Sequence, residues 1–276
     1  MHITSTFLAI LFIGLTSFHF KYPSTDTRYD DEGLVAHYTF NKCDVVDVTG
    51  NNPDGEVFGN PGCHCGVEGN AVFFDGSNDY FELPGIVNRH FGTTDFTVSF
   101  YIKPAKYSVF NQSLLSKRDS CNEYYMLDLQ LDVNKKQVKT DLYESPEKYF
   151  KDLSPDMPQS NWVHFALVRK GIYAYTYING QLRRDARRCS GVDIGNDAVL
   201  SFSNTPCLVT GRSVRFKGGL DELRVYDHAL SDEEIMQVYS LHPVETAEVD
   251  CISFYQNDES GKTGNAYFCE AGKLTY

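Results

Sequence analysis

The 276-residue sequence lacks any apolar run of the roughly 20 residues that a membrane-spanning helix needs. Basic residues are also few, because 25 Lys and Arg stand against 37 Asp and Glu, which gives a formal net charge of −12. A field of that sign repels phosphate backbones. We therefore expect neither a transmembrane segment nor a nucleic-acid partner, while the 42% of hydrophobic residues suffices for one large core.

Signatures of catalysis are missing as well. The sequence has no Gly-x-Ser-x-Gly, no His-Glu-x-x-His and no phosphate-binding loop. Asp128 and Asp132 share one face of an expected strand, but about 13 Å of strand separates them, which exceeds the roughly 5–9.5 Å between the two carboxyl groups of glycosidases. His164, beside Trp162, is interpreted as a packed histidine. The sequence thus predicts a protein that is not an enzyme, and a glycan-degrading enzyme with an unfamiliar site is the alternative.

The first 20 residues favour export. Residues 7–15 form an apolar stretch of signal-peptide length, and the small residues Thr16 and Ser17 follow it. The stretch is not preceded by Lys or Arg, so a short buried segment is the alternative. We expect a signal peptide over residues 1–20, a polar segment over 21–32, and a secreted or cell-surface protein.

The cysteines support export independently, because an even count of eight is typical of an oxidising compartment. A zinc site at Cys63-His64-Cys65 is disfavoured, since one intervening residue is tighter than usual ligand spacing. We therefore expect four disulfides, whose pairing the sequence alone leaves open. The eight are Cys43, Cys63, Cys65, Cys121, Cys189, Cys207, Cys251 and Cys269.

Most of the chain alternates apolar and polar residues with a period of two, which indicates antiparallel strands. In residues 96–102 the side chains of Phe96, Val98, Phe100 and Ile102 face one way, as in a half-buried strand. The expected strands cover residues 33–40, 70–74, 96–102, 124–131, 162–168, 172–178 and 220–226.

Turns, one helix and the chain's tail complete the outline. Asn179-Gly180 predicts a two-residue hairpin. Ser231 and Glu234 have the spacing of a capping box, so we expect a helix from there to about Leu241, before Pro243. Residues 145–161 contain three prolines and are expected to form a long loop. Residues 243–276 are expected to form a linker and a cysteine-containing tail.

Many strands with one short C-terminal helix predict an all-β fold, an antiparallel two-sheet β-sandwich. From Gly33 to Leu241 the sequence also resembles laminin-G-like jelly rolls of the concanavalin A-like lectin and glucanase superfamily, most of all the exported bacterial members. The resemblance is carried by several motifs in one order, among them Gly33-Leu-Val-Ala-His-Tyr-Thr-Phe40, Phe74-Asp-Gly-Ser-Asn-Asp-Tyr80, Tyr177-Ile-Asn-Gly180 and Phe216-Lys-Gly-Gly-Leu-Asp-Glu-Leu-Arg-Val-Tyr226. It implies a jelly roll over residues 33–242, and it implies function only loosely.

The resemblance also suggests that Cys121 lies near Cys207. Sequence neighbours suggest Cys43 with Cys63 or Cys65, and Cys251 with Cys269. Cys189 would then take whichever of Cys63 and Cys65 remains.

Two surface features are candidates for ligand binding. Tyr173, Tyr175 and Tyr177 alternate onto one face of the strand over 172–178, where a sugar ring could stack. Packing between the sheets is the alternative. Arg183, Arg184, Arg187 and Arg188 surround Asp185, and they form either a solvated loop or a docking patch for an acidic glycan or protein.

Calcium is a candidate cofactor, because hard oxygen ligands gather on two loops of a chain expected outside the cell. Asp47 and Asn51 lie on the first loop, Asp75 and Asp79 lie on the second, and Asp221 is a further candidate ligand. Related laminin-G-like domains often bind calcium at a sandwich edge. Asx turns that need no metal are the alternative.

These observations predict a secreted binding module that is not catalytic. An extracellular carbohydrate is the first expected ligand, as in a lectin, and calcium is a candidate for stabilising the fold. An adhesion or protein-interaction domain is the alternative.

Overall fold

The computed structural model describes residues 31–105, 108–158, 162–183, 187–188, 191–248, 252–257 and 263–268. The predicted signal peptide, the bridges of Cys189, Cys251 and Cys269, and the position of Arg184 lie outside these residues. In the described part of the chain, no helix is long and apolar enough to cross a membrane.

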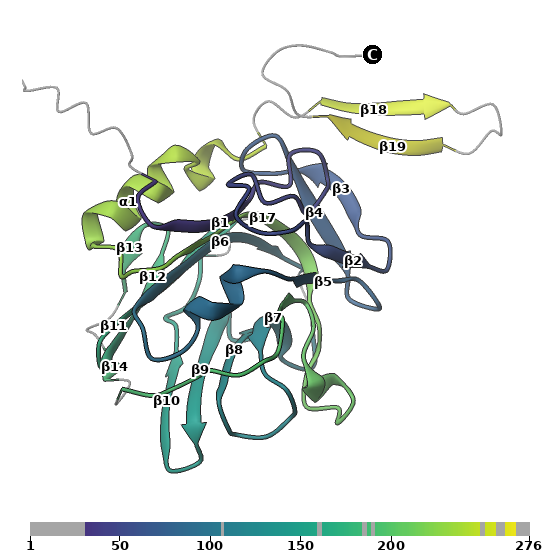
Figure 1. Ribbon diagram of the computed structural model, residues 1–276. Helices are drawn as coiled ribbons and strands as arrows, with labels where there is room; N and C mark the ends of the chain where they lie inside the picture. The colour runs from purple at the N-terminus through teal and green to yellow at the C-terminus, as the bar shows by residue number, and fades with distance from the viewer. Residues whose placement is uncertain are drawn as a thin grey trace, which may run out of the picture. The chain divides into compact units, whose positions relative to one another are not determined.

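Two antiparallel sheets form the fold, as predicted (Figure 1). The nine-stranded sheet has the order β13-β12-β11-β6-β17-β4-β3, with β1 paired to β17 and β14 paired to β12. Its strands are β1 Leu34–Tyr38, β3 Gly62–Cys65, β4 Asn70–Asp75, β6 Phe96–Pro104, β11 Val163–Lys170, β12 Tyr173–Ile178, β13 Gln181–Leu182, β14 Arg187–Arg188 and β17 Lys217–Tyr226.

The eight-stranded sheet has the order β10-β9-β8-β7-β15-β5-β2, and the short β16 joins β7 in parallel. Its strands are β2 Glu56–Phe58, β5 Tyr80–Leu83, β7 Gln112–Lys117, β8 Met126–Asp132, β9 Gln137–Ser145, β10 Lys148–Leu153, β15 Leu200–Phe202 and β16 Val214–Arg215. A separate two-stranded sheet pairs β18 Ile252–Asn257 with β19 Thr263–Phe268. The helices are η1 Ile86–His90, η2 Pro206–Leu208, α1 Asp232–Leu241 and η3 Val244–Thr246.

The hydrophobic core lies between the two large sheets. Phe96, Val98, Phe100 and Ile102 face it from β6, as the alternation predicts, and Leu127, Leu129 and Leu131 face it from β8. Each such side chain contributes about 1.5–3 kcal/mol when it leaves water. The alternation of apolar residues therefore fixes which face of each strand is buried.

The outer face of the nine-stranded sheet is also buried in part, which corrects the expectation that β6 is half-buried. Thr97, Ser99 and Tyr101 are inaccessible to solvent, although they point away from the core. Helix α1 lies over this face, since Tyr101 donates a hydrogen bond from its hydroxyl to the Tyr239 carbonyl oxygen at 3.2 Å. The capping box predicted for α1 is present, with Ser231 accepting from the Glu234 N–H and Glu234 accepting from the Ser231 N–H.

Two local predictions have opposite outcomes. Asn179 and Gly180 both have positive φ and close the hairpin in which Ile178 pairs with Gln181, as expected. The prediction of a long loop over residues 145–161 is wrong, because this segment contains β10, which pairs with β9. Its prolines flank this edge strand, while Phe150 lies inside it and packs in the core.

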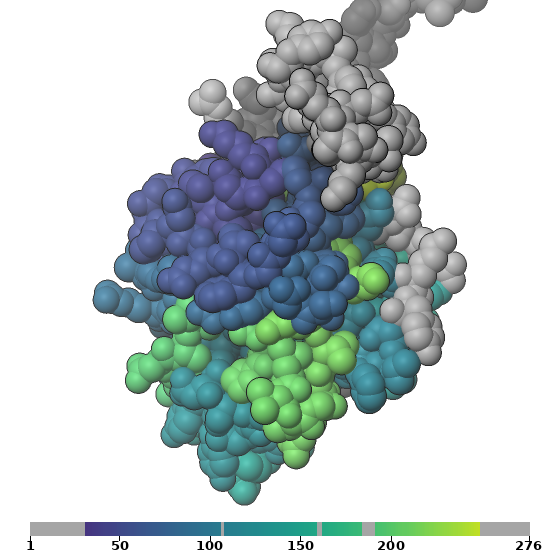
Figure 2. All heavy atoms as spheres, turned by 90° about the vertical axis from the view of Figure 1, so that its right-hand side faces the viewer, coloured from purple at the N-terminus to yellow at the C-terminus, as the bar shows by residue number. Residues whose placement is uncertain are grey.

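Disulfides tie loops to the sandwich. Cys121 pairs with Cys207, as the resemblance implied, and Cys43 pairs with Cys63, which is one of the two partners that sequence neighbours suggested. Cys65 is disulfide-bonded as well. The second bridge joins residues 118–125, which follow β7, to the segment around η2, which lies at the surface in Figure 2 (green).

Candidate functional site

The tyrosines of β12 share the outer face of the nine-stranded sheet, because Ala174 and Ile178, which belong to the alternate positions of the strand, point into the core. Their exposure differs strongly: Tyr173 is 43% exposed, Tyr175 is half-buried, and Tyr177 is only 2% exposed. The Tyr177 hydroxyl donates a 2.6 Å hydrogen bond to Asp232 in the first turn of α1. Burial and this contact raise the pKa of Tyr177. Tyr177 therefore packs against helix α1 and is covered by it, which corrects its prediction as a ligand-binding residue.

Tyr173 and Tyr175 remain as an open aromatic pair. Their ring centroids are 6.4 Å apart and the rings are tilted by 43°. At this distance and tilt neither ring covers the face of the other. A flat apolar ligand face can therefore stack on Tyr173, while its phenolic hydroxyl offers a polar contact.

The fold brings this tyrosine row together with part of the arginine cluster. Strand β14 pairs with β12, and its register sets Arg188 opposite Tyr173 and Arg187 opposite Ala174. Arg183 lies beyond β13 and is exposed. The two candidate features that the sequence suggested separately thus meet at one edge of the nine-stranded sheet.

A second aromatic pair, which the sequence analysis missed, lies on the eight-stranded sheet. Tyr143 and Tyr149 stack with centroids 4.9 Å apart, and Lys151 Nζ lies 4.9 and 5.5 Å from the two ring centroids. Tyr149 is 45% exposed, but it shares a ring face with Tyr143 and the lysine. The pairing could have been found by reading residues 148–153 as an edge strand with alternating outward side chains.

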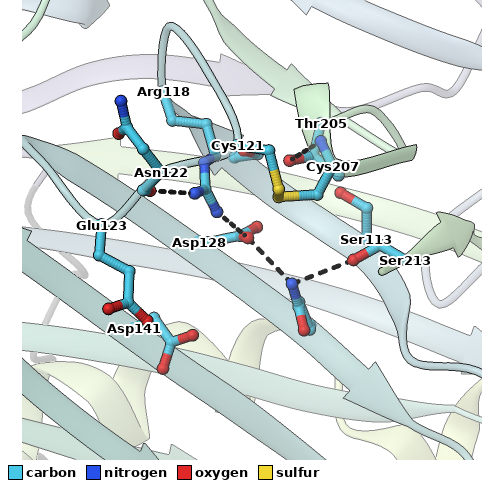
Figure 3. A network of polar contacts seen from close by, with 12 residues as sticks. Ser113, Arg118, Cys121, Asn122, Glu123, Asp128, Asp141, Thr205, Cys207 and Ser213 are labelled. Carbon is cyan, nitrogen blue, oxygen red and sulfur yellow. Dashed lines mark hydrogen bonds and ion pairs between the residues drawn. A yellow bond between two sulfur atoms is a disulfide. The ribbon is translucent and has the colours of Figure 1, made fainter. Parts of the chain in front are cut away.

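An ion pair on the outer face of the eight-stranded sheet lies beneath the loop of residues 118–125 (Figure 3). Arg118 donates from Nη1 to Asp128 Oδ2 at 2.9 Å, and the same oxygen accepts from Gln130 at 2.9 Å. Arg118 also donates to the backbone carbonyl oxygens of Ser120 and Asn122. Burial raises the pKa of Asp128, while Arg118 opposes the shift. Asp128 is thus occupied in fastening a loop, and it is closed to a substrate.

His164 is a structural residue. The Gly180 N–H donates to His164 Nδ1 at 3.3 Å, so Nδ1 is unprotonated and Nε2 carries the proton that it donates to Ser99 Oγ at 2.8 Å. Burial lowers the pKa of His164 to about 3, and the charge of Arg224 adds to the shift. A histidine with this tautomer has no free lone pair to take a proton from Ser99. The packed interpretation of His164 is therefore supported.

The carboxylates predicted to bind calcium are occupied by protein donors. Asp47 accepts hydrogen bonds from the backbone N–H groups of His37, Thr49 and Asn52. Burial opposes the charged form, but these bonds and the side chains of Asn52 and Thr49 outweigh it and hold the pKa of Asp47 below its ordinary value. Asn51 donates its side-chain amide to the Val35 carbonyl oxygen at 3.2 Å.

The other predicted ligands follow the same pattern. Asp79 accepts from the N–H groups of Asn60 and Asp75, and Asp75 accepts from that of Ser77. Asp221 is fully buried and accepts from the Val67, Glu68 and Glu222 N–H groups, while burial and the neighbouring Glu222 raise its pKa. Among the described residues, no group of three or more His, Cys, Asp or Glu is arranged to hold a metal ion. The hydrogen bonds of Asp47 with the Thr49 N–H and of Asp75 with the Ser77 N–H fit the alternative of Asx turns.

Calcium removal tests this assignment. We expect the melting temperature of the purified protein to be the same in 2 mM calcium chloride and in excess EDTA, to within about 1 °C. A site saturated at about 100 times its Kd would add about 2.7 kcal/mol, which corresponds to a rise of roughly 5–10 °C for a domain of this size. Magnesium chloride is the control for ionic strength. A rise that is specific to calcium would restore the predicted site.

Comparison with known families supports the sandwich. The family model described as the concanavalin A-like lectin/glucanases superfamily, of laminin-G type, matches residues 75–236. The chain belongs to this superfamily. No curated protein matches the sequence.

Several solved structures have a fold similar to that of this chain, although their sequence identity to it is low. Domain 4 of AbnA, an extracellular arabinanase of family GH43 from Geobacillus stearothermophilus solved with arabinotriose, is 21% identical over 75% of this chain and 98% of that chain, with a TM-score of 0.60. The binding domain of Paraclostridial Mosquitocidal Protein 1 is 16% identical over 76% of this chain and 52% of that chain, with a TM-score of 0.63.

The binding domain of botulinum neurotoxin DC, solved with rat synaptotagmin II, is 12% identical over 82% of this chain and 54% of that chain, with a TM-score of 0.61. This superfamily member thus spans about half of each toxin binding domain. At these identities the likeness shows the fold alone.

Proposed function

We propose that this superfamily member is a secreted binding module without catalytic activity, and that its ligand is a carbohydrate. The observation that carries the proposal is the open ring pair of Tyr173 and Tyr175 on a rigid strand at a sheet edge. Aromatic rings stack on the apolar faces of sugar rings, and a strand fixes the backbone that carries them, so less conformational entropy is lost on binding. The arabinotriose complex of AbnA domain 4 is consistent with a saccharide ligand on this fold.

Several features support the non-catalytic and extracellular parts of the proposal. Asp128 is bound by Arg118, and the lone pair on His164 Nδ1 accepts the Gly180 N–H. The disulfides of Cys43, Cys63, Cys121 and Cys207 are typical of an oxidising compartment. Hydrolysis of a polysaccharide by the purified protein, abolished by one carboxylate substitution, would instead favour an enzyme.

A glycan array with two matched variants tests the ligand and its place. We expect Tyr173→Ala to weaken glycan binding about 2- to 12-fold, as the loss of one stacking contact of about 0.5–1.5 kcal/mol implies. Tyr149→Ala is the control, because it removes an equally exposed tyrosine from the other sheet. Loss of binding in the Tyr149 variant alone would contradict the assignment.

A protein ligand is the second candidate. It is favoured by the synaptotagmin complex of the botulinum neurotoxin DC binding domain, which shares the fold. Two results together would establish this alternative. The glycan array would show no binding, and one purified extracellular protein would bind saturably and more weakly to the Tyr173→Ala variant.

A further inference from the structure

The loop between β7 and β8 carries two consecutive tyrosines at the surface. Tyr124 is 52% exposed and Tyr125 is 47% exposed. Cys121 of the same loop is bonded to Cys207, and the turn after Cys207 carries Val209, which is 94% exposed (Figure 3). We call Tyr124, Tyr125 and Val209 the bridged patch, because the disulfide joins the two segments that carry them. Large apolar and aromatic side chains that gather on a surface mark interaction sites.

The backbone beneath the bridged patch is held by several hydrogen bonds. Arg118 donates to two backbone carbonyl oxygens of the loop. The Tyr125 N–H donates to the Glu144 carbonyl oxygen at 3.3 Å, and the side-chain amide of Asn196 donates to the Tyr125 carbonyl oxygen at 2.6 Å. The loop is therefore fixed by the disulfide, by an arginine and by two neighbouring segments.

Tyr125 has an unusual backbone conformation. Its φ is 42°, in the left-handed region that bulky residues avoid. Such conformations persist where the surrounding structure holds them, and they cluster at functional sites. The two hydrogen bonds to the Tyr125 backbone hold it here. A partner would thus meet tyrosine rings on a backbone that is already ordered, so binding costs less conformational entropy.

The exposed charges around the bridged patch are acidic. Asp119 and Glu123 lie in the same loop and are exposed, as is Asp197. Burial lowers the pKa of Lys117, while Asp119 and Asp197 oppose the shift, so both carboxylates lie near this lysine. The two basic residues at the start of the loop, Lys117 and Arg118, are buried. The patch therefore presents aromatic rings and carboxylates together.

This combination fits a cationic partner, and arginine in particular. A guanidinium group stacks on aromatic rings and matches the two oxygens of a carboxylate. Lys151 lies 3.8 Å from Glu123, but an exposed pair of this kind contributes little and can be displaced. An acidic partner would be repelled by these carboxylates and by the net charge of −12.

We infer that the bridged patch binds a basic, arginine-bearing segment of another protein. The arginine side chains would stack on Tyr124 and Tyr125 and contact the neighbouring carboxylates, while Val209 would give an apolar contact. The loop belongs to the eight-stranded sheet, whereas Tyr173 lies on the nine-stranded sheet. The inference is therefore independent of the proposed carbohydrate ligand.

Fluorescein-labelled octa-arginine is the probe, and its fluorescence anisotropy is followed as the full chain is added. We expect saturable binding that is tighter than that of octa-lysine and weakens as salt rises, and no binding of octa-glutamate. Tyr124→Ala should weaken octa-arginine binding about 2- to 5-fold, as the loss of one exposed cation–π contact implies. Tyr173→Ala is the matched control, because it removes a similarly exposed tyrosine from the other sheet and should have no effect.

A second pair of variants tests the carboxylates. Glu123→Gln should weaken octa-arginine binding about 2- to 5-fold, as the loss of one exposed ion pair implies. Glu233→Gln, at an exposed position of α1, changes the net charge equally and should leave binding unchanged. All four positions are exposed, and melting temperatures check that the variants are folded.

The outcomes locate the binding and separate it from the proposed function. No binding of octa-arginine, or equal effects of the two tyrosine variants or of the two glutamate variants, would overturn the inference, since a general attraction to an acidic protein would then explain the data. Octa-lysine that binds as tightly as octa-arginine would show that the patch does not select arginine. A glycan array without binding would overturn the proposed carbohydrate ligand and leave this inference unchanged.

Discussion

Replacing Cys121 and Cys207 together by serine should lower the free energy of unfolding by about 4 to 5 kcal/mol. The bridge closes a loop of 86 residues, and in the chain-entropy model the stabilisation grows with the logarithm of loop length. The bridge also fastens the loop of residues 118–125, which carries Arg118 over the eight-stranded sheet. Equilibrium unfolding in urea, followed by tryptophan fluorescence from Trp162, measures the loss.

The matched control is the double serine variant of Cys43 and Cys63. Its bridge spans only 20 residues, so the same model gives about 3 kcal/mol. The long bridge should therefore cost roughly 1 kcal/mol more than the short one. An equal or smaller loss for the Cys121 and Cys207 variant would mean that loop closure does not set its contribution.

Removing the Arg118 side chain should lower the free energy of unfolding nearly as much as removing the Cys121–Cys207 bridge. Arg118→Ala leaves Asp128 fully buried without its cation, and breaking a buried pair from one side costs about 3–5 kcal/mol. The Oδ1 atom of Asp128 has no hydrogen-bond partner among the described residues, so the carboxylate depends on the contacts of Oδ2. Urea unfolding at pH 7 measures the effect.

Two further variants distinguish the contribution of the ion pair to stability from a general disruption of the loop. The double variant Arg118→Met with Asp128→Leu removes both charges and should recover much of the loss, because no buried charge remains. Lys135→Ala breaks the exposed pair with Asp132 and should cost at most about 1 kcal/mol. A double variant as unstable as Arg118→Ala would show that the loop needs the arginine for other reasons.

The pH dependence of the Arg118 variant has a definite sign. Arg118 is the main group that opposes the rise in the pKa of Asp128. Without it, the folded-state pKa rises further above the unfolded value, so the folded protein binds a proton that the unfolded chain does not. The penalty of Arg118→Ala should accordingly be larger at pH 8 than at pH 5.

Local patterns predicted the elements whose signals are local. The alternation over residues 96–102 identified β6, Asn179-Gly180 identified the hairpin of β12 and β13, and the Ser231 capping box identified α1. The same reasoning missed β10, because flanking prolines hid an edge strand whose partner β9 supplies the hydrogen bonds. An edge strand has a weaker pattern of its own, since only one of its sides is paired.

The candidate site was predictable only in part. Alternation put the three tyrosines of β12 on one face, but α1 decided that Tyr177 is covered while Tyr173 stays open. The acidic loops looked suitable for calcium because the sequence shows their carboxylates. It does not show the N–H groups that donate hydrogen bonds to those carboxylates. Asp221, for instance, accepts from the N–H groups of residues 67 and 68, more than 150 positions away.

The sequence by itself determined the two-sheet class, the buried face of each strand, the start of α1 and the presence of a cysteine framework, because each depends on neighbours within a few residues. Only the tertiary structure decided that Arg188 lies opposite Tyr173, that Arg118 covers Asp128 and that the loop carboxylates are already satisfied. Those facts depend on strand register and loop closure, which bring together groups that no local pattern relates.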